Sequence, residues 1–344
     1  LPNVYPGYQK VDESEIQRKF EGAWGVPLSG EPGLTVVEMI NAAADGALKG
    51  LYVMGENPML SDPNTNHVRE ALENLEFLCV QDIFLTETAQ LADVVLPAAS
   101  FAEKDGSFTN TERRVQRVRK ALDPPGEARQ DWAILCEIAS RLGYEMHYDD
   151  PSQILDEIAS VTPIYGGMSL ERIERVGLQW PCPDAAHAGT VFLHEGEFKR
   201  GRGKFHGVDF REAAELPDDA YPYILTTGRL LYHFHTGTMS RQTEGLERIA
   251  PPTPVEINPA DAEREGIEEG DTVEVASRRG TVHCRAVVTE RSRPGTVFMP
   301  FHFREAPANR LTNDALDPIA KIPEYKVCAV RLAKGDGEAG PDES

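Results

Sequence analysis

Apolar and polar positions follow one pattern in the first part of the chain. Short apolar runs occur at Leu51–Met54, Phe77–Val80 and Asp93–Pro97, and segments of helical period separate them. Apolar runs of about four or five residues between helices are typical of a parallel sheet that is covered on both faces. The pattern therefore predicts an α/β domain with a parallel sheet over about residues 50–145.

The helices of this domain follow from the same pattern. The sequence predicts helices over Val36–Lys49, Asn66–Asn74, Thr86–Leu91 and Asp131–Arg141. In open parallel sheets, ligands bind beyond the carboxyl ends of the strands. Asn57 follows the first apolar run, and Gln81 and Asp82 follow the second. We therefore expect these three side chains at one edge of the sheet.

From about Tyr221 the pattern changes to short strands and turns. Thr272–Ser277 and Thr281–Thr289 alternate on either side of the turn Arg278–Gly280, which predicts a hairpin. Further strands are predicted at Tyr223–Leu225, Val297–Pro300 and Val327–Leu332, and one helix at Pro259–Glu265. A small closed β-barrel is the expected arrangement of these strands.

These patterns divide the chain into four predicted parts. They are a partial α/β domain at residues 1–149, a connector at 150–215 with few regular elements, a C-terminal β-barrel at 216–333, and a disordered tail at 334–344. Residues 1 to about 30 are rich in proline, glycine and charge, so weak structure is expected there.

Composition excludes several classes of protein. The 344 residues carry a formal net charge of −21, which argues against duplex nucleic acid as a partner. No apolar run is long enough to predict a transmembrane segment, and the start of the chain does not resemble a signal peptide, so a cytoplasmic location is expected. The five cysteines are scattered without a Cys-x-x-Cys pair, which argues against an iron–sulfur, zinc or disulfide site within this chain.

The segment Thr226–Thr238 carries the strongest candidate chemistry. A strand runs into a Thr/Gly turn, and Arg229, His233 and His235 follow within seven residues. Gly and Thr let backbone amides approach a ligand, and the Arg fork suits phosphate. The segment is therefore interpreted as a loop that holds a large, phosphate-bearing cofactor. A polar turn with core-facing histidines explains the residues alone equally well.

Other candidates are weaker when each is considered alone. Asp82 follows a strand and suits a guanine edge or ribose hydroxyls, but it also suits a helix N-cap. Lys104–Gly106 offers a cation and a flexible backbone, but a solvated turn explains it as well. Asp131 stands at a predicted helix start, where capping is a sufficient reason for an aspartate.

Eight motifs in order resemble the molybdopterin oxidoreductases, and most of all the catalytic α subunit of formate dehydrogenase. They are Gly55–Pro58, Gln81–Ala89, Ala92–Pro97, Glu103–Asn110, Glu112–Gln116, Gln179–Pro183, His235–Ser240 and Pro323–Lys326. The resemblance runs from about Gly50 to Leu332. It implies a molybdenum or tungsten ion held by two molybdopterin guanine dinucleotides, and a C-terminal six-stranded double-psi barrel.

The resemblance also implies which residues contact that cofactor. In the α/β domain they are Asn57, Gln81, Asp82, Thr86, Lys104, Gly106 and Asp131. In the barrel they are the loop residues Thr227, Gly228, Arg229, His233, His235 and Thr236, followed by Phe301, Asn309, Tyr325 and Lys326, with His302 in the same region.

Members of that family carry further parts that have no counterpart in this sequence. These are a cysteine-ligated [4Fe–4S] domain, a Cys or selenocysteine ligand to the metal beside a His, and an active-site Arg. The chain resembles the carboxyl-terminal half, so no catalytic residue or metal ligand is expected in it, and it is expected to be inactive alone. The expected partners are the N-terminal half or a split subunit, and iron–sulfur or flavin electron-transfer subunits.

Three functions follow from the resemblance. The first is oxidation of formate to CO2, with two electrons leaving through the pterin; the segment Gln81–Ala89 favours this reaction. The second is a nitrate reductase on the same scaffold. The third is a scaffold homologue that binds no pterin, against which the cations Lys104, Arg229 and Lys326 argue, because an empty site does not need them.

Overall fold

The computed structural model describes residues 2–198, 200–250 and 254–335. The chain forms two compact units: one contains Leu1–Thr35 and Leu96–Val208, and the other contains Val36–Val95 and Asp209–Ser344. Most of the predicted tail, 336–344, lies outside the described residues. That the four predicted parts, 1–149, 150–215, 216–333 and 334–344, are separate folding units stays a prediction. No helix in the described ranges combines the length and apolar character needed to cross a bilayer.

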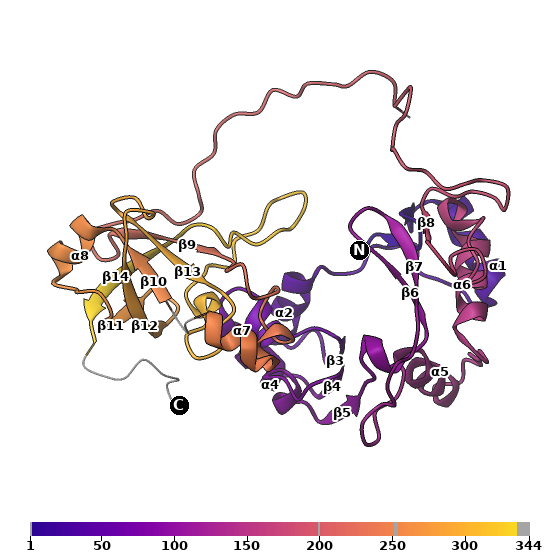
Figure 1. Cartoon of the computed structure of the whole chain (residues 1–344), viewed down its shortest axis with the longest axis horizontal. Helices are drawn as coiled ribbons and strands as arrows, with labels where there is room; N and C mark the ends of the chain where they lie inside the picture. The colour runs from indigo at the N-terminus through magenta and orange to yellow at the C-terminus, as the bar shows by residue number, and fades with distance from the viewer. Residues whose placement is uncertain (1, 199, 251–253, 336–344) are drawn as a thin grey trace. The chain divides into compact units, whose positions relative to one another are not determined.

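The second unit begins with the predicted α/β layer (Figure 1). Its sheet has the order β3 (Gly50–Met54), β4 (Phe77–Asp82) and β5 (Val94–Pro97), and β3 and β4 are parallel with Met54 opposite Gln81. The helices α2 (Val36–Ala44) and α4 (Thr65–Glu73) pack on it, and the short α3 (Pro58–Ser61) follows β3. The parallel sheet is thus confirmed; β4 ends at Asp82, and Asn57 lies just beyond the end of β3.

Two predicted helices are shorter than expected. The α2 helix ends at Ala44 rather than Lys49, because Gly46 takes a left-handed conformation with φ 72°. The segment Thr86–Leu91 forms only the 3₁₀ turn η1 (Ala89–Leu91), since the Thr86 hydroxyl accepts a hydrogen bond from the Ala89 amide at 3.2 Å.

The rest of the second unit is a closed six-stranded barrel, as predicted. Around the barrel the strands are β10 (Pro254–Ile257), β12 (Thr281–Val288), β11 (Thr272–Ala276), β14 (Cys328–Lys334), β9 (Tyr223–Gly228) and β13 (Thr296–Pro300). The pairs β9–β13 and β10–β12 are parallel and the others antiparallel, including the predicted β11–β12 hairpin. The strand β10 was not predicted. The remaining elements are η4 (Ser240–Gln242), α7 (Glu244–Ile249), the predicted α8 (Pro259–Glu265) and η5 (Ala308–Arg310).

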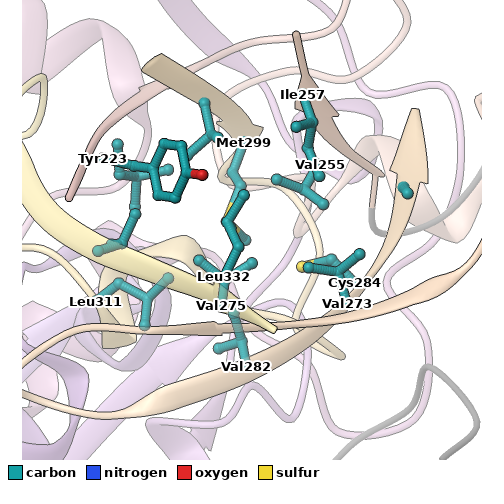
Figure 2. Packing of buried hydrophobic residues seen from close by; sticks show 14 of the residues in the cluster. Tyr223, Val255, Ile257, Val273, Val275, Val282, Cys284, Met299, Leu311 and Leu332 are labelled. Carbon is teal, nitrogen blue, oxygen red and sulfur yellow. The ribbon is translucent and has the colours of Figure 1, made fainter. Parts of the chain in front are cut away.

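Alternating inward residues fill the barrel. Figure 2 shows Tyr223, Val273, Val275 and Cys284 among the side chains packed there. Tyr223, Val273 and Val275 are fully buried, and burial raises the pKa of the Cys284 thiol to about 12. This packed core sets the strand ends in place, and the candidate site lies at those ends.

The first unit differs most from the prediction. It contains α1 (Ser14–Trp24), α5 (Asp131–Arg141), α6 (Pro151–Val161), the strand pair β1 (Val4–Tyr5) and β2 (Gln9–Lys10), the antiparallel sheet of β6 (Gly106–Thr109), β7 (Arg114–Val118) and β8 (Leu178–Gln179), and the 3₁₀ turns η2 (Phe101–Glu103) and η3 (Pro163–Tyr165). Only α5 was predicted, with these bounds. The parallel layer expected to reach about residue 145 is wrong beyond Pro97, because the chain there turns into the antiparallel β6–β7 hairpin. The helix α6 was missed although Asp150 caps it and Pro151 begins it.

Candidate functional site

A cavity of about 760 Å³ lies inside the second unit, between the barrel and the segment after β3. Eight residues that the sequence predicted as cofactor contacts line it: Thr227, Gly228, Arg229, His235, Phe301, Asn309, Tyr325 and Lys326. The other lining residues are Val36, Glu56, Pro58, Ser61 and Asp62. A cavity of this size suits a large cofactor.

The barrel topology brings these residues together. The strand β9 lies between β13 and β14, with Gly228 opposite Pro300 and Leu225 opposite Cys328. The segments that follow β9 and β13, and the one that precedes β14, therefore meet at one end of the barrel. A Cβ atom at Gly228 would lie 2.5 Å from Cε2 of the Phe298 ring, so a larger residue would force this ring to move.

Two cations stand beside this cavity. The guanidinium of Arg229 lies 5.8 Å from the centre of the Phe301 ring, and Lys326 Nζ donates to the Thr227 carbonyl at 2.6 Å. Partial burial, and secondly the positive charge of Arg229, lower the pKa of Lys326. Because the two like charges disfavour each other, an anion placed between them would stabilise both.

Two side chains of the cavity wall hold α3 against the barrel. Asn309 Nδ2 donates to the carbonyls of Leu60 and Ser61, at 2.8 and 3.2 Å. The Tyr325 hydroxyl donates to the same Ser61 carbonyl at 3.0 Å. Burial, and secondly the charge of Asp62, raise the pKa of Tyr325 above its usual range, so the phenol stays protonated. The side-chain donors of both residues are therefore already hydrogen-bonded to α3, and the two residues shape the cavity wall.

Sequence reasoning missed the two carboxylates of the cavity, Glu56 and Asp62. Asp62 is buried, and its Oδ2 has no hydrogen-bond partner among the described residues. Burial raises the pKa of Asp62 to about 6; a hydrogen bond from Ser61 opposes the shift and the charge of Glu56 adds to it. The signal that was overlooked is their position, on either side of α3, directly beyond the end of a predicted strand.

Histidines order the loop after β9. His302 is fully buried, its Nε2 accepts from the Leu230 amide at 2.8 Å, and its Nδ1 donates to the His235 carbonyl. Burial lowers the pKa of His302, so the imidazole is neutral near pH 7. His302 thus acts through the loop backbone.

His233, a predicted contact, is not brought to the 760 Å³ cavity. Its side chain is buried against Phe303, with ring centres 5.8 Å apart. Its Nδ1 lies 3.3 Å from Ser240 Oγ, while Nε2 lies 3.6 Å from Glu247 Oε1. Burial lowers the pKa of His233 as well. His233 therefore fits the alternative interpretation of this segment, in which its histidines face the core.

Thr86 and Thr236 line a second cavity of about 270 Å³ in the same unit. Its most buried cation, Arg241, is paired with Glu247 and Glu305, both at 2.8 Å. Because two carboxylates already neutralise this guanidinium, the second cavity is a poorer anion site than the first.

The carboxyl edge of the sheet holds Asn57, Gln81 and Asp82, as predicted. Asn57 is buried: its Nδ2 donates to Glu87 at 2.8 Å, and its Oδ1 accepts from the Thr88 hydroxyl at 2.7 Å. Gln81 accepts from the Tyr52 hydroxyl, and Asp82 accepts from the Ile83 amide at 2.6 Å. None of the three is among the described residues that line the larger cavity.

The first unit holds the remaining predicted contacts. Lys104, Gly106 and Asp131 line a cavity of about 240 Å³ there, next to Phe108 and Trp132. Lys104 Nζ is paired with the Asp131 carboxylate. The sequence placed these three residues in the α/β domain together with Asn57, Gln81 and Asp82, whereas the structure places them in the other unit. Their contact with a cofactor stays a prediction. Within the described parts of both units, no cluster of three or more His, Cys, Asp or Glu could hold a metal ion.

Two family models match the chain. Residues 23–141 match "Molybdopterin oxidoreductase", and residues 223–329 match "Molydopterin dinucleotide binding domain". The second match spans the barrel strands up to the start of β14 and includes every barrel residue of the 760 Å³ cavity.

The curated relatives include formate dehydrogenases from an archaeon and a bacterium. The chain is 54% identical over 339 residues to the F420-dependent formate dehydrogenase subunit alpha of Methanocaldococcus jannaschii, covering 97% of this chain and 50% of the relative. It is 39% identical over 339 residues to formate dehydrogenase H of Escherichia coli, covering 96% and 47%. The chain thus spans about half the length of these two relatives.

A solved structure shares the fold. Acetylene hydratase from Pelobacter acetylenicus matches with a TM-score of 0.65 at 19% identity, over 94% of this chain and 50% of that one. Its name specifies a different reaction, so the shared fold alone does not determine the activity.

Proposed function

The chain belongs to the molybdopterin oxidoreductase family, and from this premise we propose that it is the cofactor-binding half of a formate dehydrogenase. The support for formate as substrate is the 54% and 39% identity to two formate dehydrogenases across nearly the whole chain. The name of the archaeal relative extends the proposal to F420 as the final electron acceptor.

The residues of the 760 Å³ cavity suit a molybdopterin guanine dinucleotide. Arg229 and Lys326 offer two cations for phosphate, and Gly228 leaves the backbone open beside them. Glu56 and Asp62 offer carboxylate oxygens for the N–H groups of a pterin or guanine ring. The donor set therefore matches both the anionic and the N–H-rich parts of such a molecule.

The two smaller cavities extend the proposal to the other predicted contacts. Lys104, Gly106 and Asp131 line the cavity of the first unit, where Phe108 and Trp132 offer aromatic faces for a ring. Thr86 and Thr236 line the cavity around Arg241. Asn57, Gln81 and Asp82 would contribute by holding the sheet edge that carries α3 and Glu56.

When bound, a molybdenum or tungsten ion with its pterins would supply the two-electron chemistry that converts formate to CO2. This chain's residues would bind and orient that group. Lys326 would keep its proton beside phosphate, and neutral His302 would hold the loop from Leu230 to His235. The ligand to the metal and the [4Fe–4S] cluster would come from the part of the enzyme that this chain does not match, and iron–sulfur or flavin subunits would carry the electrons on.

The convergence of Arg229 and Lys326 at one large cavity carries this proposal, and it can be tested by cofactor content. In the assembled enzyme, Arg229→Ala should lower bound pterin and metal at least about tenfold, which corresponds to about 1.4 kcal/mol. Arg248→Ala is the matched control, because Arg248 is an exposed arginine of the same unit in a surface pair with Glu244. Full pterin occupancy in Arg229→Ala would contradict the assignment.

Substrate and acceptor need a separate assay. The assembled wild-type enzyme should turn over formate, should reduce F420 rather than NAD, and should not reduce nitrate. Pterin-loaded enzyme that reduces nitrate would support the nitrate reductase alternative, and assembled protein without pterin would support the scaffold alternative.

A further inference from the structure

The segment that connects the two units exposes several large apolar side chains. Among the described residues between β8 and β9 there is no helix or strand (Figure 1). We call residues 198–212 the connecting segment. Phe205 is fully exposed, and Phe210 and Val208 are 89% and 88% exposed.

The side chains around these apolar residues also make no polar contacts. From Arg200 to Phe210, a stretch that the structure describes completely, no side chain forms a hydrogen bond or ion pair. Glycines at 201, 203 and 207 give the segment freedom to adapt to another surface. Exposed aromatic residues that cluster in one stretch mark an interaction site.

The charge of the connecting segment is opposite to that of the chain. It carries five basic residues and two acidic ones in a protein of net charge −21; the basic residues are Lys199, Arg200, Arg202, Lys204 and Arg211. A surface that binds this segment would offer apolar pockets for the phenylalanines and carboxylates around them.

The lengths of the relatives indicate where such a surface would be. The alignment with the M. jannaschii subunit covers 97% of this chain but only 50% of the relative. An equal length of polypeptide in that protein therefore lies outside the matched region.

We propose that the connecting segment is the docking strap for the half of the enzyme that this chain does not match, which binds Phe205 and Phe210 in apolar pockets and the flanking cations with carboxylates. The proposal rests on the proposed role of the chain as one half of a formate dehydrogenase. Docking there would join both units to the other half through one segment.

Trypsin offers a direct test, because it cuts after Arg200, Arg202 and Lys204. Cleavage at these three sites should be at least about tenfold slower in the assembled enzyme than in the 344-residue chain alone, since proteolysis follows the population of accessible segment. The double variant Phe205→Asp, Phe210→Asp should lose this protection or fail to assemble. Leu142→Asp is the control: Leu142 is 82% exposed outside the segment, and its variant should assemble and stay protected.

Pterin content and formate turnover, measured on the same wild-type preparation, separate the two proposals. If active, pterin-loaded enzyme is cut as fast as the free chain, the docking role of the connecting segment is wrong and the proposed function is unaffected. If the segment is protected in assembled protein without pterin, the docking role is supported and the proposed function is wrong. Concentration-dependent protection of the chain alone would show a second copy as the occupant and would also overturn the proposal.

Discussion

His302 Nε2 accepts a hydrogen bond from the backbone N–H of Leu230 at 2.8 Å. The other ring nitrogen donates to the His235 carbonyl, so one buried imidazole bridges the loop that leads from β9 into the cavity. This bond requires an unprotonated Nε2, which agrees with the lowered pKa of His302.

Replacing this imidazole should loosen the loop. In His302→Leu the Leu230 amide loses its acceptor inside the protein, at a cost of about 1–3 kcal/mol. Hydrogen exchange of that amide should therefore become at least about tenfold faster. His147→Leu, at an exposed position of the first unit, should leave it unchanged. Equal exchange rates in wild type and His302→Leu would refute the bridging role.

The same histidine predicts a loss of stability in acid. Burial lowers the pKa values of His302 and His233 in the folded protein, so the unfolded chain binds more protons just below the ordinary histidine pKa of 6.5. Stability of the second unit should therefore fall as pH drops below about 6.5. Denaturant midpoints from pH 8 to 5 measure this stability, and the fall in the midpoint should be smaller in His302→Leu than in wild type. An equal fall in the two proteins would contradict the prediction.

Asp62 should act in the opposite direction. Its pKa is raised from 3.8 to about 6 in the folded state, so the folded state binds the proton more tightly than the unfolded chain. The folded protein therefore loses stability as pH rises through this window. Asp62→Asn should stabilise the protein at pH 8 by about 1–3 kcal/mol, given 1.36 kcal/mol per pKa unit, with little gain at pH 4.

Urea denaturation at the two pH values checks the Asp62 prediction. The exposed Asp45→Asn, on the same unit, is the control and should give no pH-dependent gain. A gain for Asp62→Asn that is equal at both pH values would show that the raised pKa is not its cause.

Two leucines of the second unit, one buried and one exposed, test the packing of the barrel core. Leu311 is fully buried among the residues of Figure 2, whereas Leu231 is 90% exposed in the loop after β9. Leu311→Ala should cost about 2–5 kcal/mol through lost contacts and a cavity. Leu231→Ala should change stability by less than about 0.5 kcal/mol. Thermal unfolding of the two variants side by side measures both, and similar losses would contradict the burial of Leu311 in the barrel core.

Much of the second unit could be predicted because its pattern is local. Continuous apolar runs indicated β3, β4 and β5, and strict alternation indicated β11 and β12. The motif order identified the family, which the family models confirm. The helix α6 was missed although Asp150 and Pro151 mark its start, because the surrounding residues were read as a connector.

Local patterns were sufficient to predict the parallel sheet, the barrel hairpin and the residue types that suit a phosphate-bearing cofactor, since each depends on neighbours a few positions apart. Which of those residues share a cavity depends instead on long-range strand pairing. Strand pairing of β9 with β13 and β14 brings Arg229 and Phe301 to Lys326, and the contact of Asn309 with α3 adds Asp62. Asn57 and His233 are instead engaged in internal contacts. Pairing over about 70–100 residues of chain depends on barrel closure and core packing, which have no signature in a local pattern.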